Sequence, residues 1–137
     1  ITNPWAETDT AGLYVCGINL TTPYYIVVRH RNHIAVISSS TVVIDNNPMY
    51  DFTISEAQAL GTNQLIGVAS GKFALYAGDF NGDGVITVSD FNVYTQQSSF
   101  INQYLPADAN MDKNVTVADF NLYLPNASRI GYYAIRF

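Results

Sequence analysis

DFNGDGVITVSD, residues 79–90, places an acidic or amide side chain at positions 1, 3, 5 and 12 of a twelve-residue stretch. DANMDKNVTVAD, residues 108–119, repeats those side chains at the same four positions. In a calcium-binding loop, short side chains at positions 1, 3 and 5 turn their oxygen atoms inward. Position 12 then brings a carboxylate back from the helix that follows. The repeated pattern therefore predicts two calcium ions, one in each stretch.

Each loop is expected to use side-chain oxygens at positions 1, 3, 5, 9 and 12 and the backbone carbonyl group at position 7. The expected ligands are Asp79, Asn81, Asp83, Val85, Thr87 and Asp90 in the first loop, and Asp108, Asn110, Asp112, Asn114, Thr116 and Asp119 in the second. Oxygen ligands without Cys or His exclude zinc and copper, and magnesium fits a flexible cage of this kind poorly. Asp, Asn and Gly also form ordinary surface turns, but two full matches in tandem favour calcium.

The two loops differ at position 6, where the backbone of such a loop normally takes a positive φ. Gly84 supplies that conformation without strain in the first loop, whereas the second loop has Lys113 there. A side chain in the left-handed region is strained. The second loop is therefore predicted to bind calcium more weakly than the first.

The charge of the chain is concentrated in these loops. The formal net charge is −5, and six of the 11 acidic residues are the loop aspartates. Bound cations would offset the repulsion among carboxylates held so close together. An acidic chain without a basic patch argues against nucleic acid as a partner.

Short apolar segments separated by turn-forming clusters precede the loops. Strands are expected within residues 12–20, 23–31, 33–38, 41–45, 50–55, 64–70 and 72–78, and a brief helical turn within 55–60. Several short strands at this spacing predict an antiparallel β-sandwich. A helix is expected after each loop, with Phe91, Val93 and Tyr94, and then Phe120, Leu122 and Tyr123, on the inward faces.

The chain is thus expected to be mainly β with a small α part. The expected organisation is a small β-sandwich in residues 1–77, a double calcium-binding domain in 78–129 and a C-terminal strand in 130–137. In that strand, Tyr133, Ile135 and Phe137 of GYYAIRF would share one face. No apolar run approaches the roughly 20 residues that a membrane span needs.

Residues 78–129 resemble dockerin-type repeats, which are paired calcium loops that end in Asp, each followed by one helix and with no helix before the loop. The resemblance implies an EF-hand-like, calcium-dependent module that grips a cohesin partner through a Ser/Thr pair at loop positions 10 and 11. This chain has Val88–Ser89 and Val117–Ala118 at those positions, a departure from the family pattern.

The region upstream of the loops is similar to a module near the C-termini of large secreted bacterial surface proteins, which are often exported by type IX secretion. The similarity lies in the stretches YYIVVRHRNHIAVIS, YDFT, GTNQ and KFALYAGDFNGDG. The resemblance implies an extracellular or cell-surface location in a bacterium. The familiar form has more strand sequence before YYIVVRHRNH. We therefore expect an open sandwich edge. Because the chain begins at ITNPWAETD without an initiator Met or a signal peptide, we also expect a processed or trimmed piece of a longer protein.

RHRNH, residues 29–33, is the one cluster with catalytic character, through Arg29, His30, Arg31 and His33. No nucleophile accompanies it in sequence, and the chain has no phosphate loop, nucleophile elbow or HExxH motif. Cys16 is the single cysteine, so neither an intrachain disulfide nor a thiolate zinc cluster can form. We therefore expect a structural role for the cluster, with hydrogen bonds that tie a hairpin to neighbouring loops, and no enzymatic activity.

These observations predict a non-catalytic, calcium-stabilised structural module for cell-surface or filament assembly. Its partners would be other copies of itself or another surface protein, joined by strand addition through residues 131–137. Two alternatives remain: a true dockerin that anchors a larger protein to a cohesin-like partner, and a carbohydrate-binding adhesin. Trp5 and ten tyrosines suit sugar stacking as well as packing, and Thr10 lies in a three-residue pattern typical of bacterial O-glycosylation.

Overall fold

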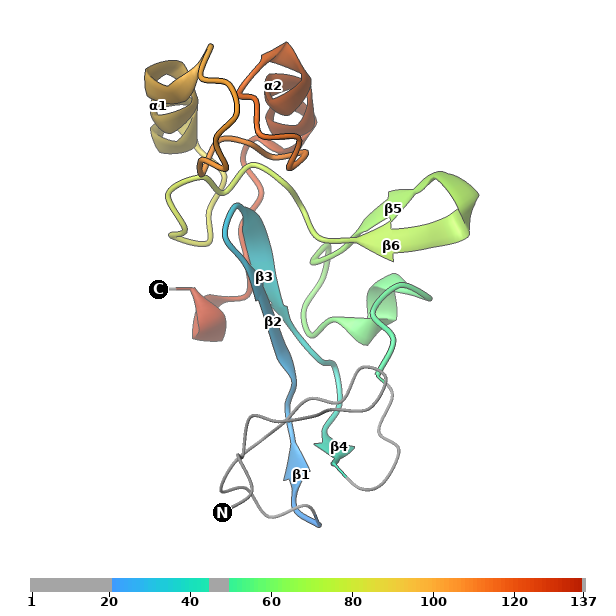
Figure 1. The fold of residues 1–137 in the computed structure, drawn as a ribbon. Helices are drawn as coiled ribbons and strands as arrows, with labels where there is room; N and C mark the ends of the chain where they lie inside the picture. Colours follow the sequence, from blue (N-terminus) through green and yellow to red (C-terminus); the bar gives the residue numbers. More distant parts are fainter. Residues whose placement is uncertain (1–20, 45–49, 137) are drawn as a thin grey trace, which may run out of the picture.

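The computed structural model describes residues 21–44 and 50–136, which form a small mixed fold of antiparallel strand pairs and two helices. The strands pair as β1 (Pro23–Tyr24) with β4 (Val42–Val43), β2 (Val27–His30) with β3 (His33–Ile37), and β5 (Ile66–Val68) with β6 (Lys72–Ala74). The β2–β3 hairpin runs from the β1–β4 end of the molecule toward the two helices (Figure 1). Each sheet in the described ranges has two strands, so the expected β-sandwich is not confirmed.

Residues 50–55, expected as a strand, form a turn instead. Asp51 Oδ1 accepts hydrogen bonds from the backbone N–H of Thr53 at 2.8 Å and from its hydroxyl group at 2.7 Å, and such local bonds compete with an extended backbone. The helical turn expected in 55–60 is confirmed as the 3-10 helix η1 (Glu56–Gln58). The other short helices are η2 (Ala69–Gly71), η3 (Leu124–Asn126) and η4 (Tyr133–Ile135). The strand expected in 12–20 lies outside the described residues.

The two α-helices follow the loops directly, as predicted. They are α1 (Val88–Gln97) and α2 (Val117–Tyr123), and each begins with a capping box formed by the loop residues at positions 9 and 12. On the expected inward faces, Phe91, Val93, Tyr94, Phe120 and Tyr123 pack in the core, whereas Leu122 is 40% exposed. Among the described residues, no helix has the length and apolar character that a membrane crossing requires.

The internal repeat extends beyond the loops and helices into the turns that follow them. Ser99 after α1 and Ser128 after α2 have nearly equal positive φ angles, 75° and 76°. Ser128 donates its N–H to the carbonyl of Ile86 in the first loop at 2.8 Å, and Ser99 donates its N–H to the carbonyl of Val115 in the second loop at 2.9 Å. Each loop therefore pairs with the turn that follows the helix of the other repeat. The two repeats are interlocked through backbone bonds.

The larger core cluster joins the hairpin to both loops. It contains Ile34 of β3, Ile86 of the first loop and Val115 of the second, all at most 1% exposed. A smaller cluster contains Val36 of β3 with Ala59 and Leu65. Because Ile34 shares its cluster with both loops, the boundary expected between residues 77 and 78 runs through a single packed core.

The C-terminal segment does not form the expected strand. Ile130 makes one isolated antiparallel bridge with Val85, and η4 follows. Gly131 permits this path, because a Cβ atom built there would lie 2.8 Å from Ile34 Cγ2. Tyr133 is 71% exposed whereas Ile135 is buried, so these two side chains do not share a face. The segment packs against its own chain, beside the hairpin (Figure 1). Phe137 lies outside the described residues.

Candidate metal centre

The first loop is closed by its own carboxylates. Asp79 Oδ2 accepts the backbone N–H of Gly84 at 3.0 Å, and Asp83 Oδ1 accepts that of Val85 at 2.9 Å. Asp90, at position 12, accepts the N–H of Asn81 at 3.1 Å and that of Thr87 at 2.8 Å. Asp79 and Asp90 are buried within the loop, whereas Asp83 lies at its exposed rim.

The second loop repeats these four hydrogen bonds at the same loop positions. Asp108 Oδ2 accepts the N–H of Lys113 at 3.1 Å, and Asp112 Oδ1 accepts that of Asn114 at 2.8 Å. Asp119 accepts the N–H groups of the loop residues at positions 3 and 9, at 3.1 and 2.8 Å. Asp108 and Asp119 are 0% exposed. The sequence repeat is thus a repeat of backbone geometry.

The loops differ at the first aspartate. Among the described residues, no donor reaches the buried Oδ1 atom of Asp79. In the second loop, the corresponding atom of Asp108 accepts the N–H of Asp112 at 3.0 Å. A buried carboxylate oxygen without a donor is energetically unfavourable, and a cation is the partner that would satisfy it. The first loop therefore has a buried carboxylate oxygen without a hydrogen-bond donor in the described ranges, and the corresponding oxygen of the second loop has one.

The pKa of Asp79 reflects the same environment. Burial raises the pKa of its carboxyl group from 3.8 to about 6, although the Gly84 N–H opposes the rise, and the charges of Asp90 and Asp83 add to it. In contrast, hydrogen bonds from Asn110 and Asn114 lower the pKa of Asp112, which lies at the exposed rim of the second loop. Burial therefore disfavours the ionised form of Asp79 unless a cation lies beside it.

The side-chain donor atoms of the loops are carboxylate and amide oxygens. Within residues 21–44 and 50–136, no group of three or more His, Cys, Asp or Glu side chains converges into a metal site. Each loop combines two buried aspartates with an exposed asparagine and an exposed aspartate. Calcium accepts such mixed sets of six to eight oxygen atoms, whereas zinc needs a compact set that includes nitrogen or sulfur atoms.

The backbone at position 6 is as predicted. Gly84 has a φ of 79° and Lys113 a φ of 74°, so the lysine is held in the strained left-handed region. Position 4 shows the same feature, with Gly82 at 76° and Met111 at 62°. The strain at Met111 was not predicted, although aligning the two loops places it opposite a glycine. The second loop therefore carries two strained residues where the first has two glycines.

The threonines at position 9 cap the helices that follow the loops. Thr87 Oγ1 accepts the N–H of Ser89, and Thr116 Oγ1 accepts the N–H of Ala118, both at 3.2 Å. These hydroxyl groups cap the two helices, because an N-cap side chain satisfies a donor that the helix leaves free. The structure places both threonines at the rim of their loops.

The RHRNH cluster makes the expected hydrogen bonds from the hairpin to neighbouring segments. Arg31 lies 3.4 Å from Asp108 Oδ2, and the Asn32 side chain also bonds to the second loop. Arg29 donates to the carbonyl group of Ile135 at 2.7 Å. His30 and His33 contact each other, with 2.9 Å between their Nδ1 atoms. Burial, and the neighbouring charges of His30 and Arg31, lower the pKa of His33 to about 4.

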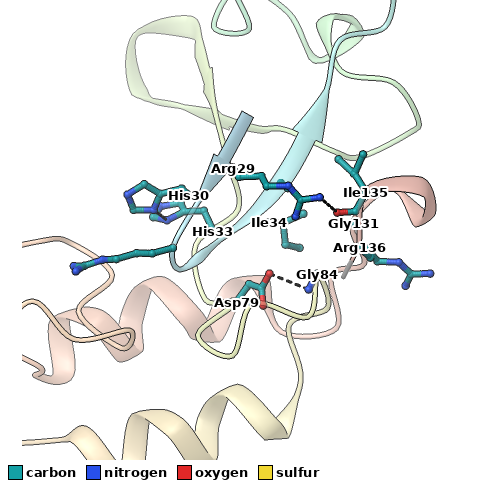
Figure 2. A pocket seen from close by; sticks show the side chains of 12 residues that line it. Arg29, His30, His33, Ile34, Asp79, Gly84, Gly131, Ile135 and Arg136 are labelled. Carbon is teal, nitrogen blue, oxygen red and sulfur yellow. Dashed lines mark hydrogen bonds between the residues drawn. The ribbon is translucent and has the colours of Figure 1, made fainter. Parts of the chain in front are cut away.

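A cavity of about 160 Å³ lies between the hairpin, the first loop and the C-terminal segment. Figure 2 shows Asp79 and Arg29 facing it from opposite sides, with hydrogen bonds to Gly84 and Ile135, respectively. Arg136 covers the loop, because a Cβ atom at Gly84 would meet its side chain at 2.5 Å. The cavity therefore belongs to the surroundings of the first loop. No sequence pattern pointed to Arg136.

Comparisons with known proteins give no relative. No protein-family model, no curated protein and no solved structure matches the chain. The function is therefore argued from the geometry of the loops. Thr10, Trp5 and Cys16 lie outside the described residues.

Proposed function

We propose that residues 78–129 form a double calcium-binding unit within a non-catalytic, extracellular structural module. The observation that carries the proposal is the matched pair of loops, with a buried carboxylate oxygen of Asp79 that lacks a donor among the described residues. Two chance surface turns would not share four carboxylate–amide bonds at the same offsets. Calcium binding accounts for the spacing, the buried charge and the strained backbone together.

In the first loop, Asp79, Asn81, Asp83 and Asp90 would hold the ion with side-chain oxygens, and Val85 with its carbonyl group. In the second loop, Asp108, Asn110, Asp112, Asn114 and Asp119 would take the same places. Two ions would bring the formal charge from −5 to about −1, which removes most of the repulsion among the aspartates. The role of the ions is to stabilise the fold.

Thermal unfolding with and without a chelator tests this proposal. A ligand that binds only the folded form adds about 2.7 kcal/mol of stability at a hundredfold excess over its Kd. We expect calcium to raise the melting temperature, and magnesium at the same concentration to raise it much less. A melting temperature that neither calcium nor chelator changes would refute the proposal.

The assembly role extends this proposal to partners at the cell surface. The dockerin-type resemblance and the similarity to C-terminal surface modules support it. Strand addition could complete a β-sandwich around the small sheets. For residues 131–137 to join a neighbouring chain, they must leave the first loop and break the bonds from Gly131 to Gly84 and from Arg29 to Ile135. Deleting residues 131–137 tests this step: an assembly that persists unchanged would exclude the donor-strand role.

A dockerin-like anchor is the second candidate, and one observation favours it. Val88 and Val117, at position 10 of the two loops, are 68% and 66% exposed. Large apolar side chains this exposed, one in each repeat, suit a protein partner, although they stand where the dockerin pattern has Ser or Thr. Pull-down with an immobilised cohesin tests this candidate, and Val88→Glu should abolish any binding while leaving the fold intact. The carbohydrate-binding alternative has no comparable feature among the described residues.

A further inference from the structure

Asn32, in the turn between β2 and β3, is fully buried, with 0% of its surface exposed. Its side-chain amide donates hydrogen bonds to the backbone carbonyl of Asp108 at 2.7 Å and to that of Pro106 at 3.1 Å. Its Oδ1 atom accepts a hydrogen bond from His33 Nδ1 at 2.7 Å. Because Nδ2 can only donate and Oδ1 can only accept, the three bonds fix the orientation of the amide.

The first loop has a matching asparagine. Asn126 is 5% exposed, and its amide donates to the carbonyl of Ala77 and to that of Leu122, both at 2.9 Å. Ala77 and Pro106 occupy equivalent places, two residues before the first aspartate of each loop. A buried asparagine thus holds the start of each loop. For the first loop, the asparagine comes from the end of the second repeat. For the second loop, it comes from the hairpin, 76 residues away from Asp108.

We propose that Asn32 is a positioning residue for the second metal loop, through which the β2–β3 hairpin sets the calcium affinity of that loop. The inference rests on the proposed calcium binding. The two amide bonds hold the backbone at Asp108 in place before an ion binds, so that less ordering is needed on binding. Arg31 contributes less, because its side chain is 35% exposed and lies 3.4 Å from the carboxylate.

The coupling is reciprocal. If the hairpin raises the affinity of the second loop for calcium, calcium in that loop must stabilise the hairpin turn by the same factor. A buried asparagine that served only general stability would instead affect both loops alike. The two roles therefore predict different results for the two loops.

Calorimetric titration with calcium, in variants that keep one intact loop, distinguishes the positioning role of Asn32 from a role in general stability. Asp90→Asn disables the first loop, and Asp119→Asn disables the second. Adding Asn32→Ala should weaken binding to the second loop roughly tenfold and leave the first within about twofold, on the scale of one or two lost hydrogen bonds. Asn126→Ala is the matched control and should weaken the first loop only. Equal losses in both loops, or none, would overturn the positioning role.

A second measurement covers the case in which Asn32→Ala fails to fold. In the Asp90→Asn variant, calcium should slow hydrogen exchange at the amide of Ile34 in the hairpin, which donates to the carbonyl of Tyr76. The exchange at Phe73, whose amide bonds to Thr53, should slow by a smaller factor. An Ile34 amide that calcium does not protect beyond Phe73 would refute the coupling. If the unmutated chain binds no calcium at all, the proposed function itself fails. If it binds calcium but Asn32→Ala changes neither loop, only the positioning role of Asn32 fails.

Discussion

Replacing Gly84 with alanine tests how the sixth position of the first loop supports the C-terminal segment. Gly84 has a φ of 79°, and a Cβ atom built there would lie 2.5 Å from Arg136 Cγ and 3.0 Å from Arg136 Cβ. Atoms in folded proteins do not approach so closely, so the base of the Arg136 side chain would have to move. The substitution therefore combines backbone strain with a steric clash.

Gly82 in the same loop provides a matched control. Its φ is 76°, and no atom lies within 4 Å of a Cβ built there. Gly82→Ala should therefore lower stability by the backbone strain alone, about 1 kcal/mol. Gly84→Ala adds the displacement of a packed side chain, typically 1–3 kcal/mol, so its total loss should be about 2–4 kcal/mol.

Urea unfolding in saturating calcium measures both losses under the same conditions. Combining Gly84→Ala with Arg136→Ala should recover most of the difference between the two glycine variants, because the clash is removed. Equal losses for Gly82→Ala and Gly84→Ala, or no recovery in the double variant, would show that the C-terminal segment does not rest on the loop.

Three further predictions concern the loops and the hairpin. Lys113→Gly should relieve about 1 kcal/mol of backbone strain and raise the calcium affinity of the second loop about fivefold in calorimetry, and an unchanged affinity would contradict this. Because the pKa of His33 is lowered to about 4 in the folded state, its neutral form contributes stability that is fully present above pH 6.5 and is lost as the pH falls toward about 4. Urea unfolding across this range should show the loss, and His33→Gln should flatten it. The raised pKa of Asp79 has the opposite effect in metal-free protein. The stability contributed by its protonated carboxyl group is present below pH 3.8 and is lost as the pH rises through about 6. Asp79→Asn should remove that decline in the free energy of unfolding.

Local features of the chain were predictable from its sequence. The helices after the loops, the hairpin turn in RHRNH and the helical turn at residues 55–60 follow from capping residues, turn-forming residues and periodicity. The positive φ at Lys113 followed from the loop pattern alone. These features depend on residues close together in the chain, so their physical causes can be read in a short window.

Features that depend on distant contacts were not predictable. The strand expected at the C-terminus fails because Gly131 bonds to Gly84 and turns the chain back. The strand expected at residues 50–55 fails because the Asp51 side chain competes for the backbone of Thr53. The bond from Asn32 to Asp108 joins residues that no local pattern connects.

The number of calcium ions bound per chain tests the central claim most directly. We expect equilibrium dialysis followed by elemental analysis to find two calcium ions in the unmutated chain and one in each of the variants Asp79→Ala and Asp108→Ala. We also expect the ion lost in Asp79→Ala to be the more tightly bound one, because the first loop has the unsatisfied carboxylate and the unstrained glycines. A chain that retains no calcium at millimolar concentration, or that retains two ions in either variant, would contradict the account.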